Sequence, residues 1–345
     1  MSPITMTIII TSLATGTIIT STSHHWLMAW MGLEMNTLSI LPIISKQHHP
    51  RATEAATKYF LTQAAASALI LFSSTINAWK SGTWDITQMT DTTSNILLTS
   101  ALAMKLGIAP MHFWLPEVLQ GSTMKTALII STWQKLAPMA LMTLTANNLS
   151  PTALILMGTL SSVIGGWGGL NQTQVRKLMA YSSIAHLGWM ATISAIMTNI
   201  MTLNLFLYIT MTTSMFSMLI LSKSKTIQDT ATSWTTSPTT TIMMMLTLLS
   251  LGGLPPLTGF MPKWLILEEL TMQNMIPTAT ILALASLLSL YFYLRIAYTT
   301  TLTTSPNTTT TKHKWRFKPT STTTLLTSTL PLTLLTLPMT PLILL

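Results

Sequence analysis

Cysteine is absent from this chain of 345 residues, and charged side chains are scarce. Without cysteine, the chain can form no disulfide and offers no thiolate to a metal ion. Only 7% of its residues are charged, against roughly 25% in a soluble domain, while 49% are hydrophobic. The mean hydropathy is a modest +0.52 because many apolar runs contain serine or threonine, whose hydroxyls can bond back to a helix carbonyl in lipid. This composition predicts a membrane protein.

The net charge of +9 is scattered among the loops and forms no basic patch, so we expect no nucleic-acid partner. The segment 300–321, Thr-rich and then basic, is typical of a surface linker that contacts lipid headgroups, and cardiolipin is a candidate lipid at the basic loops. The histidines lack the spacing of a metal site, and the sequence contains no phosphate-binding loop and no nucleophile–base set. We therefore predict no cofactor and no metal in this chain.

Apolar runs long enough to cross a bilayer predict an all-α, polytopic fold with about eleven transmembrane helices. Their expected limits are 3–21, 25–45, 57–78, 95–118, 123–146, 151–170, 174–196, 199–222, 239–275, 277–299 and 322–345. The ninth run, of about 37 residues, is too long for one straight crossing of ~30 Å at ~1.5 Å per residue. We therefore expect a break inside it.

Basic residues indicate the orientation. Under this topology the loops on one side contain nearly all of the lysine and arginine, whereas the loops on the other side contain only Lys80, beside Asp85 and Asp91. This asymmetry predicts that the N-terminus faces the positive side and the C-terminus faces the opposite side.

The fourth and ninth spans contain residues that interrupt a helix. Pro110 has no amide hydrogen and leaves the carbonyl of Leu106 without its helical partner. Broken backbone at membrane depth persists only where protein or water satisfies it, typically along an ion pathway. The residues predicted to form the two breaks are Gly107 and Pro110, then Gly252, Gly253, Pro255 and Pro256.

The two broken spans occupy the same place in two successive groups of five helices. Because five is odd, the two groups are expected to have opposite orientations, as in inverted repeats with a transport site at their interface. The predicted division is a first repeat at 1–149, a second repeat at 150–299, the linker at 300–321 and a closing transmembrane helix at 322–345.

Four ionisable residues fall near the middle of predicted spans: Glu34, Lys105, Lys135 and Lys263. A lysine at membrane depth costs on the order of 2.5–3.5 kcal/mol by insertion scales, so it is rarely accidental. The four groups fit a proton relay. Glu34 beside Lys105 would hold the proton of the lysine, and separation of the pair would make the lysine a better donor. The alternative is a set of structural ion pairs that pin helices together.

Two histidines are candidate relay groups. His112 lies two residues after Pro110, and His186 lies in the seventh span, which is second in its repeat. A lone histidine in a membrane can equally be a satisfied hydrogen-bonding group between helices.

The relay makes geometric predictions. We expect Glu34 and Lys105 to approach within about one water of each other, because burying either charge alone is costly. Adjacent relay groups should be joined by waters near one plane at half membrane depth. This expected line contains Glu34, Lys105, Lys135, His186 and Lys263.

Several segments together resemble a known family. They read MGLEMN at 31–36, RATEAATKYFLTQ at 51–63, MKLGIAPMHFWLPEV at 104–118, TWQKLAP at 132–138, GGLNQTQVRKLMAYSSIAHLGWM at 168–190 and LGGLPPLTGFMPKW at 251–264. With these motifs the chain resembles the NADH dehydrogenase subunit 2 family of vertebrate mitochondrial respiratory complex I, which is antiporter-like. The resemblance covers nearly the whole chain, and only 80–100 and 300–345 are nondescript.

The resemblance implies a location in the mitochondrial inner membrane, with the N-terminus and basic loops in the matrix and the C-terminus in the intermembrane space. It implies assembly with other membrane-arm and accessory subunits, which would bind NADH, flavin, iron–sulfur clusters and ubiquinone. The family's glutamate–lysine pair falls on Glu34 and Lys105, its bridging lysine on Lys135 and its distal lysine on Lys263. The second repeat has His186 where a carboxylate is expected, which leaves Lys263 without an evident counter-ion.

The residues and the resemblance predict a core membrane-arm subunit that contributes to proton translocation, with no redox catalysis in this chain. Replacing Lys135 or Lys263 with alanine is expected to lower pumping while assembly survives. Two other functions stay open. A free-standing cation/proton antiporter would favour more acidic residues in the spans than Glu34. A structural membrane subunit with a vestigial line of lysines would keep pumping after the mid-span charges are neutralised.

Overall fold

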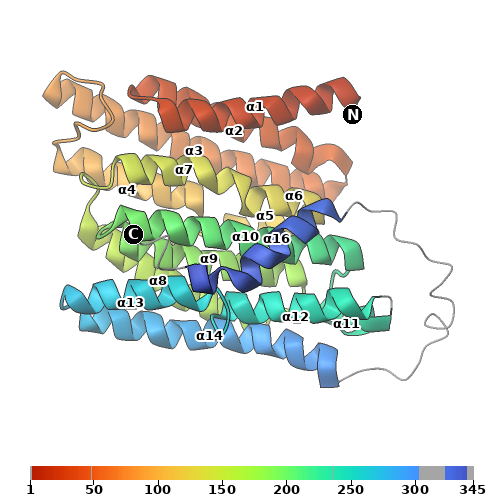
Figure 1. Cartoon of the computed structure of the whole chain (residues 1–345). Helices are drawn as coiled ribbons and strands as arrows, with labels where there is room; N and C mark the ends of the chain where they lie inside the picture. The colour runs from red at the N-terminus through yellow and green to blue at the C-terminus, as the bar shows by residue number, and fades with distance from the viewer. Residues whose placement is uncertain (1, 48, 236, 303–322, 340–345) are drawn as a thin grey trace. The chain divides into compact units, whose positions relative to one another are not determined.

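The computed structural model describes residues 2–47, 49–235, 237–302 and 323–339, and in these ranges it contains helices and two isolated β-bridges but no strand (Figure 1). The all-α prediction is confirmed. The predicted linker residues 303–321 and residues 322 and 340–345 of the predicted closing helix lie outside the described residues.

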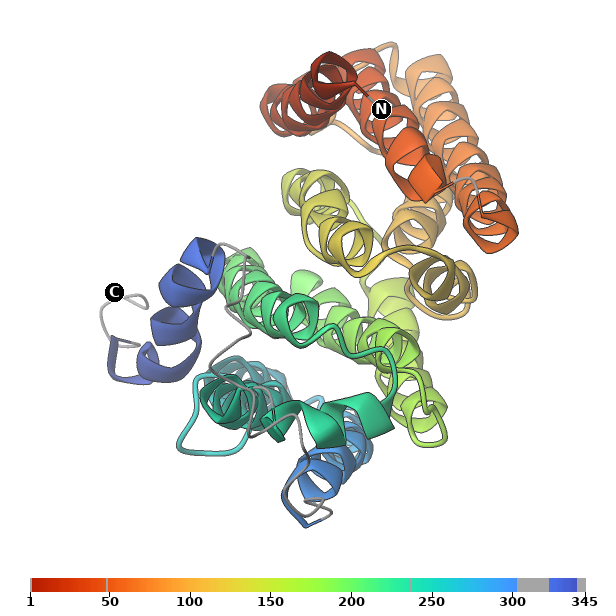
Figure 2. The same ribbon diagram turned by 90° about the vertical axis from the view of Figure 1, so that its right-hand side faces the viewer.

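Figure 2 views many of the helices nearly end-on. The first helices in the chain are α1 (Pro3–Thr22), α2 (Trp26–Ile44), α3 (Pro50–Ser81), α4 (Thr92–Leu106), α5 (Trp114–Gly121), α6 (Met124–Ser131) and α7 (Trp133–Leu144). They are followed by α8 (Pro151–Gly169), α9 (Val175–Ser194), α10 (Thr198–Ser222), α11 (Ile227–Thr232), α12 (Pro238–Gly252), α13 (Phe260–Met272), α14 (Ile276–Leu302) and α16 (Thr324–Leu335).

The chain divides into two compact units. Unit 1 contains Met1–Ser161 and Leu187–Met201, and unit 2 contains Ser162–His186 and Thr202–Leu345. The start of α8 and the end of α9 therefore belong to unit 1, whereas the predicted repeats divide the chain at 149/150. In unit 1 the paired helices include α1 with α2 and α3 with α4, and in unit 2 α14 packs along both α12 and α13 (Figure 1).

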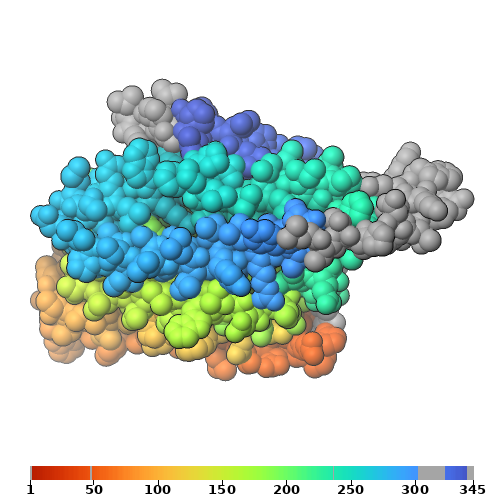
Figure 3. Space-filling model, turned by 90° about the horizontal axis from the view of Figure 1, so that it is seen from below, coloured from red at the N-terminus to blue at the C-terminus, as the bar shows by residue number. Residues whose placement is uncertain are grey.

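Among the described residues, six helices are long and apolar enough to cross a membrane: α1, α2, α3, α8, α10 and α14. Figure 3 shows α14 at the surface, where it exposes apolar side chains such as Leu284 and Leu287. Hydroxyls inside the helices bond back as the composition suggested. The Thr20 hydroxyl donates to the Thr17 carbonyl at 2.8 Å, and many other serines and threonines do the same.

Both predicted helix breaks are present. The first lies between α4 and α5 and begins at Gly107, and the second lies between α12 and α13 and begins at Gly253. Both glycines have φ of 79°, in the left-handed region that glycine adopts without a steric penalty. The N–H of Gly107 donates to the Ala103 carbonyl at 2.9 Å, which closes the end of α4 in the usual way.

The fifth span differs from the prediction of one continuous helix at 123–146. It is divided at Thr132 into α6 and α7. The hydroxyls of Ser131 and Thr132 both donate to the Leu128 carbonyl, at 3.0 and 2.7 Å, and such back-bonding bends helices. Pro138 weakens the same stretch because it has no N–H for the carbonyl four residues earlier.

The two units repeat a loop contact. In unit 1, His25 before α2 forms an antiparallel bridge with Asp85, which follows α3. In unit 2, Gln174 before α9 forms the same type of bridge with Thr226, which follows α10. The helices α2 and α9 therefore correspond, as do α3 and α10.

A close helix contact repeats in the same register. Aligning His25 with Gln174 also aligns Gly16 with Gly165. A Cβ atom on Gly16 would lie 2.9 Å from the Gly32 carbonyl oxygen, and one on Gly165 would lie 2.9 Å from the Tyr181 carbonyl oxygen. In each unit, only glycine permits this approach of two helices. The matching contacts support the prediction of an internal repeat.

Candidate functional site

A small polar cavity lies in unit 1 among α2, α3, α4, α5, α6 and α7. Its volume is about 20 Å³, which is room for about one water. The polar residues that line it are Asn36, Thr37, Tyr59, Gln63, Lys105, Gln134 and Lys135. Two of the predicted site lysines, Lys105 and Lys135, therefore face the same cavity.

Lys105 lies in the last turn of α4, where the helix dipole favours a cation, and it is only 6% exposed. Its ammonium nitrogen is buried and has no hydrogen-bond partner among the described residues. Two cavity-lining side chains donate to carbonyls at this helix end, and the Met104 carbonyl also accepts from the Gly107 N–H at 3.3 Å. Trp114 Nε1 donates to the Met104 carbonyl at 3.1 Å, and Gln63 Nε2 donates to the Lys105 carbonyl at 3.5 Å.

The carboxylate of Glu34 in α2 interacts electrostatically with the Lys105 ammonium and with the Tyr59 hydroxyl. Its Oε2 atom is buried and has no hydrogen-bond partner within the described ranges. In that part of the chain, no ion pair within 4.0 Å joins Glu34 to Lys105. The two charges therefore interact across a gap, and their separation by one water stays a prediction.

Lys135 lies in the first turn of α7 and is 3% exposed. The break at Thr132 brings this turn to the cavity, where the Lys135 N–H donates to the Thr132 carbonyl at 3.3 Å. Gln134 next to it links three helices. Its Nε2 donates to the Asn36 carbonyl at 3.3 Å, and its Oε1 accepts from the Tyr59 hydroxyl at 3.4 Å. We call Glu34, Lys105 and Lys135 the first half-site.

Lys263 of α13 lies at the break in unit 2. Its Nζ donates to the Gly252 carbonyl at 2.8 Å, so the ammonium caps the C-terminal end of α12. A Cβ atom on Gly253 would lie 2.9 Å from that Nζ, so the glycine also makes room for the lysine. In the described part of the chain, no carboxylate forms an ion pair with Lys263. We call Lys263 and Gly252 the second half-site.

The two breaks share a sequence pattern that gives their register. When Gly107 is aligned with Gly253, two prolines that follow each glycine also align, and Glu117 aligns with Lys263. The aligned prolines are Pro110 with Pro256 and Pro116 with Pro262. Lys263 therefore occupies the position of Glu117, after the break, whereas Lys105 lies before its break.

His186 does not occupy the position of Glu34. The alignment of His25 with Gln174 places Ser183 opposite Glu34, so the expectation of a histidine there is corrected by three residues, nearly one helical turn. Ser183 is hydrogen-bonded to Tyr208, whose ring lies 5.7 Å from the His186 ring. His186 is thus close to the equivalent position but lies on the next turn.

His112 lies inside the first break, where its Nδ1 is 3.3 Å from the Pro110 carbonyl oxygen and its ring packs on Phe113. It is absent from the described residues that line the cavity. Within the described ranges, no three histidine, aspartate or glutamate side chains gather to hold a metal. The structure thus brings Lys105 and Lys135 to one cavity and places Glu34 where its charge acts on Lys105, and the predicted line from these residues to Lys263 stays a prediction.

The sequence reading missed Tyr59, Gln63 and Gln134. All three belong to motifs that carried the family resemblance, RATEAATKYFLTQ and TWQKLAP. Two amides within predicted membrane spans were a usable signal, because an unsatisfied amide in lipid costs several kcal/mol, roughly 2–7 depending on the reference state. The sequence interpretation considered the ionisable residues of these spans and left out the amides.

Comparisons with known proteins agree over the whole chain. A family model described as NADH:quinone oxidoreductase/Mrp antiporter, TM, matches residues 23–289, and one described as NADH dehydrogenase subunit 2 C-terminus matches residues 290–344. NADH-ubiquinone oxidoreductase chain 2 of Varanus timorensis is 58% identical over 342 residues, which are 99% of each chain. The protein of the same name from Salmo salar is 57% identical over 347 residues, 99% of this chain and 98% of the relative.

Solved structures share the fold. A chain of respiratory complex I from Thermus thermophilus has a TM-score of 0.81 at 25% identity, covering 93% of this chain and 74% of that one. A chain of the Mrp complex from a Dietzia species has a TM-score of 0.80 at 15% identity, covering 97% and 75%.

Proposed function

The chain belongs to the NADH dehydrogenase subunit 2 family and is an antiporter-like subunit of the membrane arm of respiratory complex I, and from this premise we propose that it translocates protons. The proposed proton carriers are the ionisable residues Glu34, Lys105, Lys135 and Lys263. The chain does this as a subunit of NADH–ubiquinone oxidoreductase, while other subunits bind NADH, flavin, iron–sulfur clusters and ubiquinone.

One observation supports the proposal most directly, which is the cavity shared by Lys105 and Lys135. Proton transfer between fixed groups needs hydrogen-bond reach, about 2.6–3.2 Å, or one bridging water. A cavity of about 20 Å³ holds about one water, and its amide and hydroxyl groups offer that water the polar partners it needs. A structural ion pair would instead place Lys105 within 4.0 Å of a carboxylate, and among the described residues none lies there.

The first half-site works as a switch in this proposal. The Glu34 carboxylate stabilises the Lys105 ammonium while the two are close. When Glu34 moves away, Lys105 gives a proton to the cavity water and that water gives one to Lys135, so one amine becomes neutral as the other becomes charged. Return of Glu34 and uptake of a proton from one side of the membrane recharge Lys105, and release of the proton from Lys135 toward the other side restores the starting state.

Lys263 is the carrier in the second half-site. A neutral amine keeps two N–H donors, so Lys263 can release a proton and still donate to the Gly252 carbonyl. The bond weakens on release, because a charged donor makes a hydrogen bond roughly twice as strong as a neutral one. The state of the second half-site is thus coupled to how firmly α12 is capped.

The proposal includes the surroundings of the chain. The chain lies in the mitochondrial inner membrane, with its N-terminus and basic loops in the matrix and its C-terminus in the intermembrane space. The distribution of basic residues among the loops supports this orientation. Other membrane-arm and accessory subunits cover part of its apolar surface, and membrane lipids, with cardiolipin at the basic loops, cover the rest.

Lys135→Met tests the proposal in the assembled complex reconstituted into vesicles. The ratio of protons translocated to NADH oxidised should fall, while NADH oxidation by a soluble artificial acceptor stays normal. Lys125→Met, at an exposed position of α6, is the matched control and should leave the ratio unchanged. An unchanged ratio in Lys135→Met would favour a structural subunit with vestigial lysines.

A further inference from the structure

Helix α5, the second piece of the first broken helix, is fixed along one face of α3. At one end of the contact, a Cβ atom on Gly121 would lie 2.7 Å from the Arg51 carbonyl oxygen, so the two backbones touch. At the other end, the rings of Tyr59 and Trp114 meet edge to face at 5.7 Å between centroids. The contact therefore runs along the whole of α5.

An ion pair lies between these two contacts. Lys58 Nζ of α3 is 2.6 Å from Glu117 Oε2 of α5 and 2.5 Å from Glu54 Oε1, one turn earlier on α3. Only the bond to Glu117 joins two helices. Glu117 also lies in the first turn of α5, where no side chain caps the helix and a negative charge is favoured by the dipole.

The position of α5 decides how the end of α4 is satisfied. Trp114, the first residue of α5, donates its indole N–H to the Met104 carbonyl, and Met104 precedes Lys105. A shift of α5 away from α3 would withdraw this donor and open the wall that Trp114 contributes to the cavity. The Lys58–Glu117 pair is thus mechanically connected to Lys105 through one side chain.

The repeat in the chain supports a role for this position. Glu117 aligns with Lys263, and each is a charged residue that directly follows an aligned proline, Pro116 or Pro262. In unit 2 this residue holds the broken helix by donating to the Gly252 carbonyl. In unit 1 the charge has the opposite sign and holds the broken helix by pairing with a neighbouring helix.

We propose that Glu117 is a positioning residue of the first half-site, and that its ion pair with Lys58 holds α5 against α3 so that Trp114 keeps the end of α4 closed around Lys105. The proposal rests on the proton-translocating function proposed above. It assigns Glu117 no proton to carry.

The test compares Glu117→Gln with Glu54→Gln in the assembled complex in vesicles. Both changes remove one carboxylate from the same ammonium, but only Glu117 joins α5 to α3. We expect Glu117→Gln to lower the ratio of protons translocated to NADH oxidised by about two- to fivefold, the range for losing a half-exposed ion pair. Glu54→Gln and the charge-conserving Glu117→Asp should stay close to the parent ratio. Equal ratios in Glu117→Gln and Glu54→Gln would overturn the proposal.

The dependence of the translocation ratio on salt tests whether Glu117 acts through its ion pair with Lys58. Raising the salt from about 0.05 to about 1 M shortens the screening length to ~3 Å, so the parent should move toward the Glu117→Gln value while the variant stays constant. A gap between them that persists at high salt would overturn the positioning role. Lys105→Met distinguishes failure of the wider function: if it pumps normally, the proton pathway itself is wrong, whatever Glu117 does.

Discussion

The two broken helices share one backbone device and use their lysines differently. Both breaks begin at a glycine with φ of 79°. In the first, Lys105 precedes the break, and its buried ammonium has no hydrogen-bond partner among the described residues. In the second, Lys263 follows the break, and its ammonium donates to the carbonyl of the last residue of α12. One lysine interacts with a carboxylate across a gap, and the other is hydrogen-bonded to a helix end.

The different surroundings of Lys105 and Lys263 mean that loss of a proton has different structural consequences at the two lysines. Loss of a proton from Lys105 removes a charge that no hydrogen bond satisfies, so the backbone around it has little reason to move. Loss of a proton from Lys263 weakens a charge-assisted bond that closes α12. The first half-site is therefore suited to a rapid change of charge, whereas a change of charge in the second is coupled to the geometry of the break.

Replacement of each lysine should show the largest contrast. Lys105→Met and Lys263→Met should both abolish most of the proton translocation, but only Lys263→Met should also destabilise the subunit. It leaves the buried Gly252 carbonyl unsatisfied, at a cost of about 1–3 kcal/mol. The yield of assembled complex on native gels, measured beside the translocation ratio, checks this.

That expectation differs from the one drawn from the sequence, that assembly survives replacement of Lys263. Equal yields of the two variants, with pumping lost in both, would show that water or another donor replaces the ammonium at Gly252. Lys125→Met, at an exposed position of α6, serves as the control for yield.

Alanine at the two glycines should have a smaller and unequal effect. Each substitution forces a left-handed conformation on alanine, at a cost of about 1–3 kcal/mol. At Gly107 the new Cβ would meet Leu115 Cδ1 at 3.3 Å, whereas at Gly253 it would meet Lys263 Nζ at 2.9 Å. Gly253→Ala should therefore lower pumping per assembled complex, and Gly107→Ala should mainly lower the yield. Equal pumping in the two variants would contradict the role of Gly253 in seating Lys263.

Sequence was sufficient for the backbone of these sites. Proline and glycine act locally, through a missing N–H and a permitted φ, so both breaks followed from single residues such as Pro110 and Gly253. The mid-span lysines were equally visible because charge in lipid is costly. The break at Thr132 was missed because it arises from side-chain hydroxyls that compete for one carbonyl, a weak signal in a chain so rich in threonine.

Partners across helices could not be read in the same way. The carbonyl that accepts from Lys263 and the amide that connects Gln134 to Asn36 are contacts between segments far apart in the chain. The register of the repeat was within reach, since Pro116 and Pro262 continue the pattern started by the glycines. That register pairs Glu117 with Lys263, whereas the pairing of Glu34 with Ser183 comes from the bridges at His25 and Gln174, which only the structure shows.

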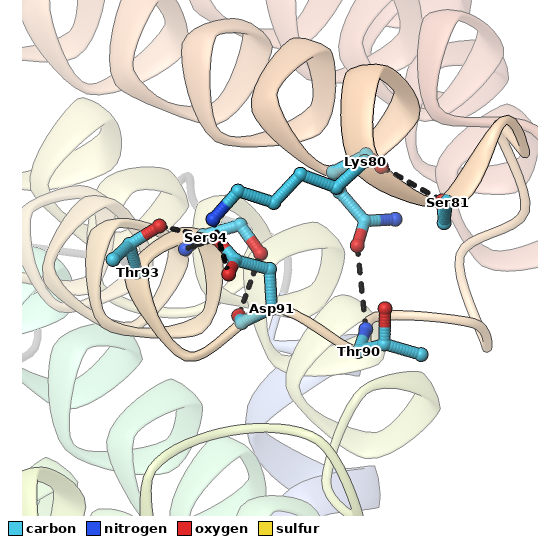
Figure 4. A network of polar contacts seen from close by, with 7 residues as sticks. Lys80, Ser81, Thr90, Asp91, Thr93 and Ser94 are labelled. Carbon is cyan, nitrogen blue, oxygen red and sulfur yellow. Dashed lines mark hydrogen bonds and ion pairs between the residues drawn. The ribbon is translucent and has the colours of Figure 1, made fainter.

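The smallest predicted difference concerns the acidic helix caps outside the membrane spans. Asp91 caps α4 in unit 1, and its carboxylate is 2.6 Å from Lys80 Nζ and accepts from the Thr93 hydroxyl and the Ser94 N–H (Figure 4). The lysine, first of these, lowers the pKa of Asp91 from 3.8 to about 2. Asp229 completes the capping box of α11 in unit 2 with the N-cap residue Thr226, and its pKa is lowered mainly by the backbone N–H groups of Thr226 and Lys225.

Both carboxylates have a lower pKa in the folded state than in the unfolded chain, so each stabilises its helix end at pH values above the unfolded-state pKa. This stabilisation is lost as the pH falls through the folded-state pKa, which for Asp91 means between about pH 4 and pH 2. At neutral pH and low salt, Asp91→Asn keeps a capping oxygen but loses the lysine, so amide exchange in the first turn of α4 should rise about two- to fivefold. High salt should bring the parent close to the variant there, since a half-exposed ion pair is screened. Asp229→Asn should change exchange at α11 by an amount that salt barely affects, because fixed backbone donors hold that carboxylate. Hydrogen–deuterium exchange of the peptides that contain the starts of α4 and α11, corrected for intrinsic rates, measures both effects. Equal salt sensitivity at the two helix starts would mean that Lys80 does not supply the stabilisation of Asp91.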